Sequence, residues 1–206
     1  MYFEVDHPCV KHKLTILRDK NTNSKQFREL ASELTKFIAY EALKNIELED
    51  VEIETPLAKM TGKQIKNDVI FIPVLRAGVG MLDGILDLVP TGKVGFVGLY
   101  RDHNTKEAVE YYCKLPEVDK NSQVLIVDPM LATGGSLIAA IDLLKREGYN
   151  RITVVTIISS PEGIKTLEEA HPEVKVYTGN VDDYLDDNKY IVPGLGDAGD
   201  RLFGTK

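Results

Sequence analysis

The chain has 206 residues, which is enough for one well-buried globular domain and short for two. With 43% apolar and 28% charged residues, its composition is typical of a folded protein and excludes a disordered, collagenous or coiled-coil chain. The formal net charge of −7 disfavours a broad nucleic-acid-binding surface but allows a local cationic pocket for a small phosphate compound.

The first half of the chain is predicted to contain two helices and two strands. Apolar side chains recur at helical spacing from Phe27 to Ile38, after Asn23 or Ser24 as N-cap. A later run is continuously apolar and β-branched, which is typical of a strand buried on both faces, and Pro73 marks its end. In chain order, we expect a helix over residues 24–44, a half-buried strand over 51–55, the buried strand over 69–75 and a helix over 79–89.

The second half continues the alternation of strands and helices. We expect strands over residues 94–100, 111–115, 124–127, 151–158 and 174–178, and helices over 136–147 and 162–170. This order predicts an α/β fold, with a mostly parallel twisted sheet and helices on both faces, in a single domain over residues 1–206. The polar segment 101–110 is expected to form a hairpin or hood. Residues 181–206, acidic and then Gly-rich, are expected to form a loop-rich appendage.

The spacing of the cysteines and the length of the apolar runs indicate the cellular compartment in which we expect the protein. Cys9 and Cys113 form no CxxC pair, so we expect reduced thiols. The N-terminus has no basic segment followed by an apolar one, and no apolar run approaches the ~18 residues that a membrane span needs. We therefore expect a cytoplasmic protein with no membrane partner.

The segment from Asp128 to Ser136 is the strongest candidate for a ligand site. In a parallel sheet, ligands bind at the carboxyl ends of strands, and here a buried strand delivers a carboxylate followed by a Gly-Gly loop that opens into a helix. Converging N–H groups and the helix N-terminus favour a phosphate. The alternative is a tight turn with Ser136 as an ordinary N-cap. A Walker A loop is excluded because Ser136 stands where its Lys is required.

The Asp128–Ser136 segment resembles the 5-phosphoribosyl 1-diphosphate (PRPP) loop of the type I phosphoribosyltransferase family. The C-terminal segment over residues 190–201 is similar to that of the family's uracil branch, and the Leu75–Gly78 turn and residues 100–102 extend the resemblance over essentially the whole chain. Most family members carry two adjacent acids at the strand end, whereas Pro129 follows Asp128 here. The uracil branch has the same replacement.

This resemblance implies a pyrimidine-salvage transferase that converts uracil and PRPP to UMP and diphosphate with Mg²⁺, through an oxocarbenium-like transition state. The implied catalytic residues are Arg76, Arg101, Asp128 and Asp197. The implied PRPP-binding residues are Arg76, Arg101, Asp128, Pro129, Met130, Leu131, Ala132, Thr133, Gly134, Gly135, Ser136 and Asp197. The implied uracil-binding residues are Ile191, Gly196, Asp197 and Ala198, which make most of their contacts through backbone atoms.

Physical chemistry suggests a role for each charged residue. Arg76 and Arg101 would stabilise the leaving diphosphate, and Asp128 and Asp197 the electron-poor ribose. Alternatively, Arg76 pairs with Asp83 or another acid, and Arg101 lies at a solvated hairpin tip. We expect Mg²⁺ to bind through diphosphate and water, with no protein ligands. The acid pairs at residues 182–183 and 186–187 are accordingly interpreted as a solvated loop.

Two other functions stay open. An RNA-binding regulator of the same fold would need a basic surface, which the net charge disfavours. A transferase for another base, such as orotate or a purine, would be distinguished by base competition. The family resemblance further implies a homodimer or homotetramer and a GTP activator.

Overall fold

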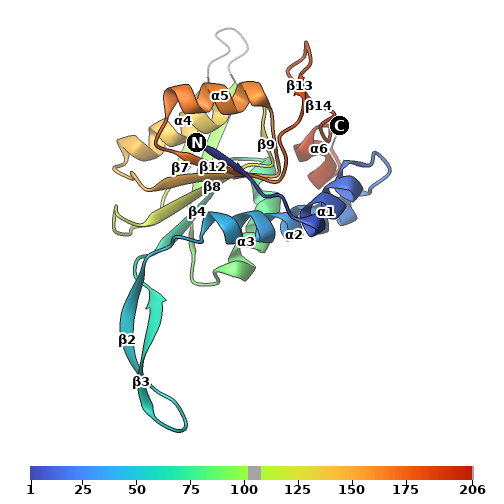
Figure 1. Ribbon diagram of the computed structural model, residues 1–206. Helices are drawn as coiled ribbons and strands as arrows, with labels where there is room; N and C mark the ends of the chain where they lie inside the picture. Colours follow the sequence, from blue (N-terminus) through green and yellow to red (C-terminus); the bar gives the residue numbers. More distant parts are fainter. Residues whose placement is uncertain (102–107, 206) are drawn as a thin grey trace.

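The computed structural model of the chain describes residues 1–101 and 108–205. Its centre is a six-stranded parallel sheet in the order β1-β12-β10-β8-β4-β5 (Figure 1). The strands of this sheet are β1 (Tyr2–Glu4), β4 (Val69–Pro73), β5 (Lys93–Val94), β8 (Gln123–Val127), β10 (Ile152–Thr156) and β12 (Lys175–Thr178). Every residue of β4 and β10 is buried, because helices cover both faces. The predicted α/β fold class is confirmed.

Helices pack on the two faces of the sheet in separate layers (Figure 1). On one face lie α1 (Pro8–Arg18), α2 (Ser24–Ala42) and α3 (Leu82–Leu88); on the other lie α4 (Gly135–Arg146) and α5 (Pro161–Ala170). Alternate strand residues face alternate layers. Phe71 and Leu125 belong to the core under α1–α3, whereas Ile70 and Ile126 belong to the core under α4 and α5.

Four small two-stranded sheets surround the central one. Two are antiparallel hairpins, β2 (Leu48–Glu54) with β3 (Lys59–Ile65) and β6 (Phe96–Arg101) with β7 (Ala108–Lys114). The third pair, β9 (Met130–Leu131) with β11 (Ile158–Ser159), is parallel, and the fourth, β13 (Tyr184–Leu185) with β14 (Ile191–Val192), is again antiparallel. The β2–β3 hairpin projects from the body of the molecule as an arm (Figure 1).

Several predicted boundaries differ from the structure. The predicted helix over residues 79–89 is a 3₁₀ turn, η1 (Ala77–Met81), that runs into α3. The predicted strands over 94–100 and 151–158 each break in two, where the chain leaves the central sheet for a small one. The C-terminal appendage contains β13, β14 and a short helix, α6 (Ala198–Phe203). None of the described helices is both long and apolar enough to cross a bilayer.

Candidate active site

The loop between β8 and α4, residues 128–136, is held in shape by the segment between β10 and α5. Strand β9, within the loop, pairs with β11. Two backbone N–H groups that follow β10 donate to the Pro129 carbonyl at 3.1 and 3.0 Å. The Ser160 hydroxyl, which also caps α5, donates to the Ala132 carbonyl at 2.6 Å. The loop is therefore tied to the scaffold on both sides of Leu131.

The first turn of α4 is open to an anion. The helix begins at Gly135 after Gly134, whose φ of +87° suits glycine, and no side chain caps the first turn. The predicted alternative, in which Ser136 is an ordinary N-cap, is therefore wrong: Ser136 lies inside the helix and is exposed. By contrast, a side chain caps each of α1, α2, α5 and α6. Uncapped N–H groups and the helix dipole make this turn suitable for a phosphate.

Asp128 is the first residue of the same loop, directly after β8. Its carboxylate is half-buried and accepts a hydrogen bond from the Met130 N–H at 3.2 Å. Burial raises the pKa of Asp128 to about 7, although the Met130 hydrogen bond opposes the shift. At neutral pH the protonated and the ionised forms of the Asp128 carboxyl group are therefore both populated.

The Arg76 turn lies next to Asp128 because β4 and β8 are neighbours. The Val74 N–H donates to the Val127 carbonyl at 3.0 Å, and a Cβ at Gly78 would come within 2.4 Å of the same oxygen, so only glycine fits there. The Leu75–Arg76 peptide bond is cis. The Arg76 side chain is 65% exposed, and its guanidinium lies 4.0 Å from Asp200. Among the described residues it pairs with Asp200 and not with Asp83, so most of its hydrogen-bonding capacity faces solvent.

Arg101 is the last residue of β6, and the structure does not describe its side chain. Most of the polar segment predicted to form a hood, residues 102–107, lies outside the described residues. The roles assigned to Arg101 and to this segment stay predictions.

The C-terminal segment contributes backbone atoms more than side chains. Ile191 and Ala198, two of the predicted uracil-binding residues, have buried side chains that belong to the core under α1–α3. Gly196 is exposed with φ of +80°. Asp197 is also exposed, and its carboxylate caps α6 by accepting the Asp200 N–H at 2.9 Å. Any contact that Ile191 and Ala198 make with a ligand is therefore limited to their main chain.

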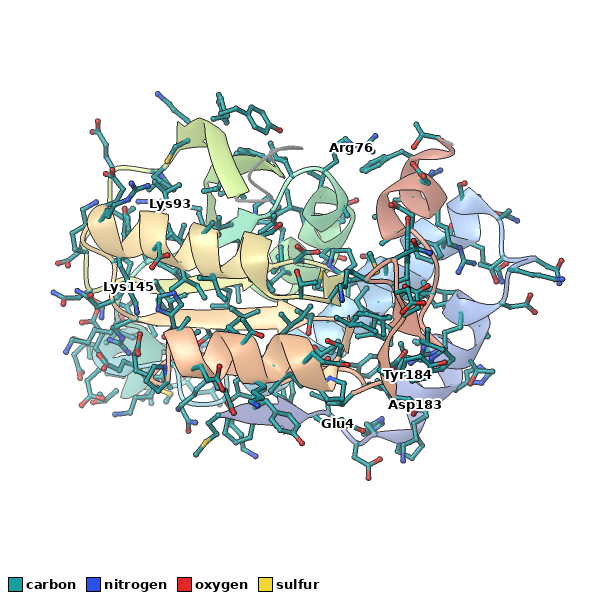
Figure 2. The ribbon with its side chains drawn as sticks, turned by 90° about the horizontal axis from the view of Figure 1, so that it is seen from above. Glu4, Arg76, Lys93, Lys145, Asp183 and Tyr184 are labelled. Atoms are coloured by element: carbon teal, nitrogen blue, oxygen red, sulfur yellow. The ribbon has the colours of Figure 1, made fainter. Side chains whose placement is uncertain are left out.

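Packing brings this segment to the Arg76 turn. Gly80 of η1 abuts Leu202 of α6, since a Cβ there would lie 2.6 Å from the leucine side chain. A Cβ at Gly199 would lie 3.8 Å from an Arg76 guanidinium nitrogen. Figure 2 shows Arg76 on the side of the molecule that carries α6, whereas Lys93 and Lys145 lie toward the other end. The Arg76 turn thus packs against both the C-terminal segment and the carboxyl end of β8.

The interpretation of Asp182 as part of a solvated acidic loop is wrong. Its side chain is fully buried and forms an ion pair with Arg18 of α1, with an Nη2–Oδ1 distance of 2.5 Å. Asp183 and Asp187 are exposed, as expected. Sequence reasoning missed the pair because α1 was not predicted and because four acids in six residues favour a surface loop. Within the described residues, no three His, Cys, Asp or Glu side chains form a group that could hold a metal ion.

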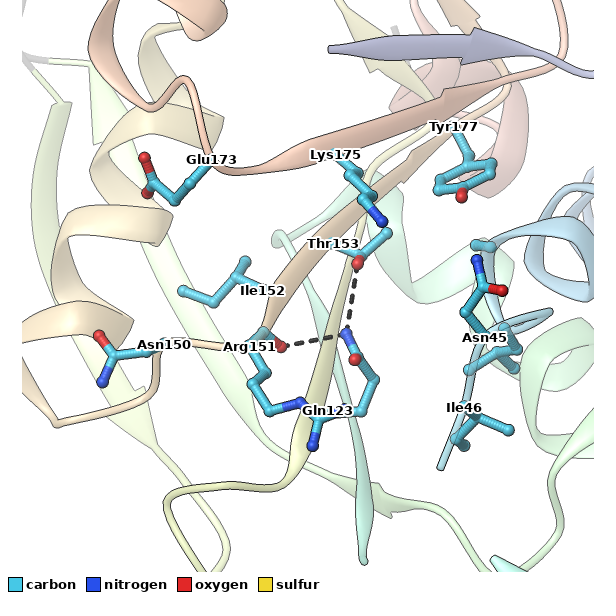
Figure 3. Close-up of a pocket in the computed structure, with 12 residues that line it drawn as sticks. Asn45, Ile46, Gln123, Asn150, Arg151, Ile152, Thr153, Glu173, Lys175 and Tyr177 are labelled. Atoms are coloured by element: carbon cyan, nitrogen blue, oxygen red, sulfur yellow. Dashed lines mark hydrogen bonds between the residues drawn. The ribbon is translucent and has the colours of Figure 1, made fainter. Parts of the chain in front are cut away.

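A polar pocket of about 250 Å³ lies at the opposite, amino end of the sheet (Figure 3). Its lining includes Gln123, Ile152 and Lys175, which are the first residues of β8, β10 and β12. The Gln123 amide donates to the Arg151 carbonyl at 3.1 Å and to the Thr153 hydroxyl at 3.2 Å. This pocket contains none of the predicted site residues.

The fold, with a loop that opens into a helix at the carboxyl edge of its sheet, is that of the type I phosphoribosyltransferases. The structure is similar to that of adenine phosphoribosyltransferase from Trypanosoma brucei, with a TM-score of 0.58 over 95% of this chain and 88% of that one. At 16% identity, this likeness concerns the fold alone.

Sequence comparison narrows the class. The family model for uracil phosphoribosyltransferase matches residues 4–205. Uracil phosphoribosyltransferases from Agathobacter rectalis and Listeria innocua are each 55% identical over 203 residues, which are 98% of this chain and 97% of theirs. A solved structure from Aquifex aeolicus has 42% identity and a TM-score of 0.93, with 98% of both chains covered. The chain belongs to the uracil phosphoribosyltransferase family, which confirms the resemblance seen in its sequence.

Proposed function

We propose that the chain transfers the phosphoribosyl group of PRPP to uracil, forming UMP and diphosphate. The observation that carries the proposal is the uncapped first turn of α4 at the end of a loop that begins with the half-buried Asp128. Membership of the family identifies uracil as the base. In this proposal residues 1–206 act as one domain, and residues 181–206 form its base-binding segment.

The 5′-phosphate of PRPP binds at the loop from Ala132 to Ser136. Backbone N–H groups at the start of α4 and the Thr133 and Ser136 hydroxyls donate to it. Pro129, Met130 and Leu131 connect this cradle to Asp128, whose carboxylate accepts hydrogen bonds from the ribose hydroxyls. This assignment is supported by the hydrogen bonds that tie the loop to the β10–α5 segment.

Arg76 and Arg101 bind the leaving diphosphate. Its negative charge grows as the C1–oxygen bond breaks, so a cationic group that binds it more tightly in the transition state lowers the barrier. The exposure of the Arg76 guanidinium and its long contact with Asp200, the one ion pair it forms with a described residue, support this role because the group keeps donors for a ligand. Asp128 and Asp197 stabilise the positive charge on the ribose.

The reaction would use Mg²⁺ bound to the diphosphate of PRPP. The site offers hard carboxylate oxygens, at Asp128 and Asp197, but no cluster of three acids among the described residues, which fits an ion held mainly by diphosphate oxygens and water. Asp128 is the protein group best placed to orient it through the ribose or its water. When bound, the ion neutralises charge on the diphosphate.

Uracil binds against the main chain of residues 191–198. Uracil presents an N3–H donor beside an O4 acceptor, which a rigid backbone distinguishes from cytosine by offering one carbonyl and neighbouring N–H groups. The buried side chains of Ile191 and Ala198 support this assignment, because they anchor the two ends of the segment and leave contacts with the base to main-chain atoms. A site without room beyond C6 rejects orotate.

The enzyme acts in the cytoplasm as a homodimer or homotetramer, with GTP as an activator and without nucleic acid or membrane partners. The β2–β3 arm supports self-association, because it extends from the body and exposes apolar side chains. Leu57 at its tip is 96% exposed, and Ile53 and Met60 are more than 40% exposed.

The proposal is tested by incubating the chain with PRPP, Mg²⁺ and one of five bases: uracil, orotate, cytosine, hypoxanthine or adenine. We expect UMP and diphosphate in equal amounts with uracil, and turnover of the other bases lower by at least about 100-fold, since a polar site rejects a mismatched base strongly. Turnover that is faster with another base would contradict the assigned substrate. No product with any base, with or without GTP, would contradict the enzyme assignment and favour RNA binding.

A further inference from the structure

The Asp182 carboxylate accepts hydrogen bonds from three other residues. Both of its oxygens accept from the Arg18 guanidinium, at 2.6 and 2.5 Å. They also accept from the Asn180 amide at 2.6 Å and from the Gly194 N–H at 2.8 Å. The carboxylate is thus saturated, in a position fully removed from solvent.

Arg18 completes this arrangement from the other side. Its Nη1 donates to the Gly194 carbonyl at 2.7 Å while the same guanidinium holds Asp182. The two side chains of the ion pair therefore form hydrogen bonds with both the N–H and the carbonyl of Gly194. Gly194 lies between Ile191 and Gly196, inside the segment assigned to uracil.

The charge on Asp182 is kept by these contacts. Burial by itself would raise the pKa of Asp182, but the hydrogen bonds and the charge of Arg18, together with the Gly194 and Asn180 donors, outweigh it and hold the pKa below its usual value. A buried ion pair adds little stability relative to well-packed apolar residues, so its value here lies in fixing a geometry.

A second arginine fixes the far side of the same segment. Arg201 of α6 donates to the Leu195 carbonyl at 2.9 Å and to the Asp19 carbonyl at 2.6 Å, and its guanidinium stacks 4.4 Å above the Phe27 ring. Consecutive residues, Gly194 and Leu195, are thus bound to α1 and α2 by charged side chains. The N-terminal helices serve as the support for this part of the C-terminal segment.

We propose that Arg18 and Asp182 are positioning residues for uracil: they set the main-chain geometry of residues 191–198 without touching the base. This inference rests on the proposed function. Asp182 contacts β11 through its main chain, whereas the hydrogen bonds of the Arg18 and Asp182 side chains are directed to Gly194 and Asn180. Loss of the side-chain pair should therefore weaken the binding of uracil far more than that of PRPP, whose loop is held by Ser160 and by the pairing of β9 with β11.

The test compares steady-state kinetics of the wild-type chain with Asp182→Asn, Arg18→Gln and the milder Arg18→Lys, which keeps the charge but loses the bidentate fork. For the first two we expect KM for uracil to rise at least about 10-fold, the factor that corresponds to one lost charged hydrogen bond. KM for PRPP should stay within about 3-fold, and Arg18→Lys should lie between wild type and Arg18→Gln. The double variant Arg18→Gln/Asp182→Asn should be no worse than the worse single variant, because the two residues act together.

Arg151→Gln is the matched control. It removes an arginine from an ion pair, with Glu47 at 3.0 Å, at the amino end of the sheet and should leave both KM values within about 2-fold, as expected for a half-exposed pair. Unchanged KM for uracil in a folded Arg18→Lys or Asp182→Asn variant would overturn the inference alone. Equal rises in both KM values with a lower melting temperature would make the pair merely structural and also overturn it. A wild-type chain that makes no UMP would overturn the proposed function, and the inference with it.

Discussion

At the scale of single residues, Asp128 combines burial with a charge that the chemistry needs. Its pKa of about 7 lies far above the usual value near 3.9, because burial disfavours the charged form and the hydrogen bond from the Met130 N–H offsets this only in part. An ionised Asp128 accepts hydrogen bonds from ribose hydroxyls better than a protonated one. In the proposed mechanism, the protonation state of Asp128 therefore links activity to pH.

We expect kcat/KM for PRPP to fall as the pH drops through about 7. Asp128→Asn should remove this inflection and lower kcat/KM at pH 8 by about 10- to 100-fold, as for a lost charged hydrogen bond.

The same substitution should not lower the stability of the fold at pH 8. A raised pKa contributes stability that is complete below the unfolded value and is lost as the pH rises through the folded value, so at pH 8 the variant, which does not ionise, should melt at the same or a higher temperature. Near-wild-type turnover in the folded variant would remove Asp128 from the mechanism.

At the scale of elements, α4 links the buried sheet to the anion site through one glycine. Gly134→Ala places a side chain at φ +87°, at a cost of about 1–2 kcal/mol, with its Cβ 3.2 Å from the Gly163 carbonyl. We expect KM for PRPP to rise about 10-fold as the first turn shifts, since 1.4 kcal/mol corresponds to a factor of ten. KM for uracil should change much less.

Gly148→Ala is the control for backbone strain in the same region. Gly148 has φ of +91° after the other end of α4, and its nearest neighbour would be the Lys120 side chain at 3.7 Å. Both variants should lose similar stability in thermal unfolding, but only Gly134→Ala should weaken the binding of PRPP. A rise in KM for PRPP that is equal in both would attribute the effect to global destabilisation.

Elements with strong local patterns were predictable from the sequence, and those held by distant contacts were not. The buried runs of β4 and β8 and the amphipathic α2 follow from hydrophobic periodicity. The strand β3 was missed because its residues are polar and mostly exposed on both faces. Asp182 was misinterpreted because its burial depends on Arg18, 164 positions away.

At the scale of the whole molecule, the two ends of the parallel sheet have different surroundings. The Arg76 turn, the loop 128–136 and the C-terminal segment meet at the carboxyl end, whereas the polar pocket of Figure 3 lies at the amino end. The sequence predicted the first three from motifs. It did not predict that helices α1 and α2 would support the C-terminal segment through Arg18 and Arg201, since such contacts join the two ends of the chain.

A crystal structure with bound UMP tests this arrangement most directly. We predict the phosphate at the first turn of α4, the ribose hydroxyls at Asp128 and the uracil ring against the main chain of residues 191–198. The Arg18–Asp182 pair should stay intact behind Gly194. UMP bound instead in the pocket between Gln123, Arg151 and Lys175, or with its base turned away from residues 191–198, would contradict the account.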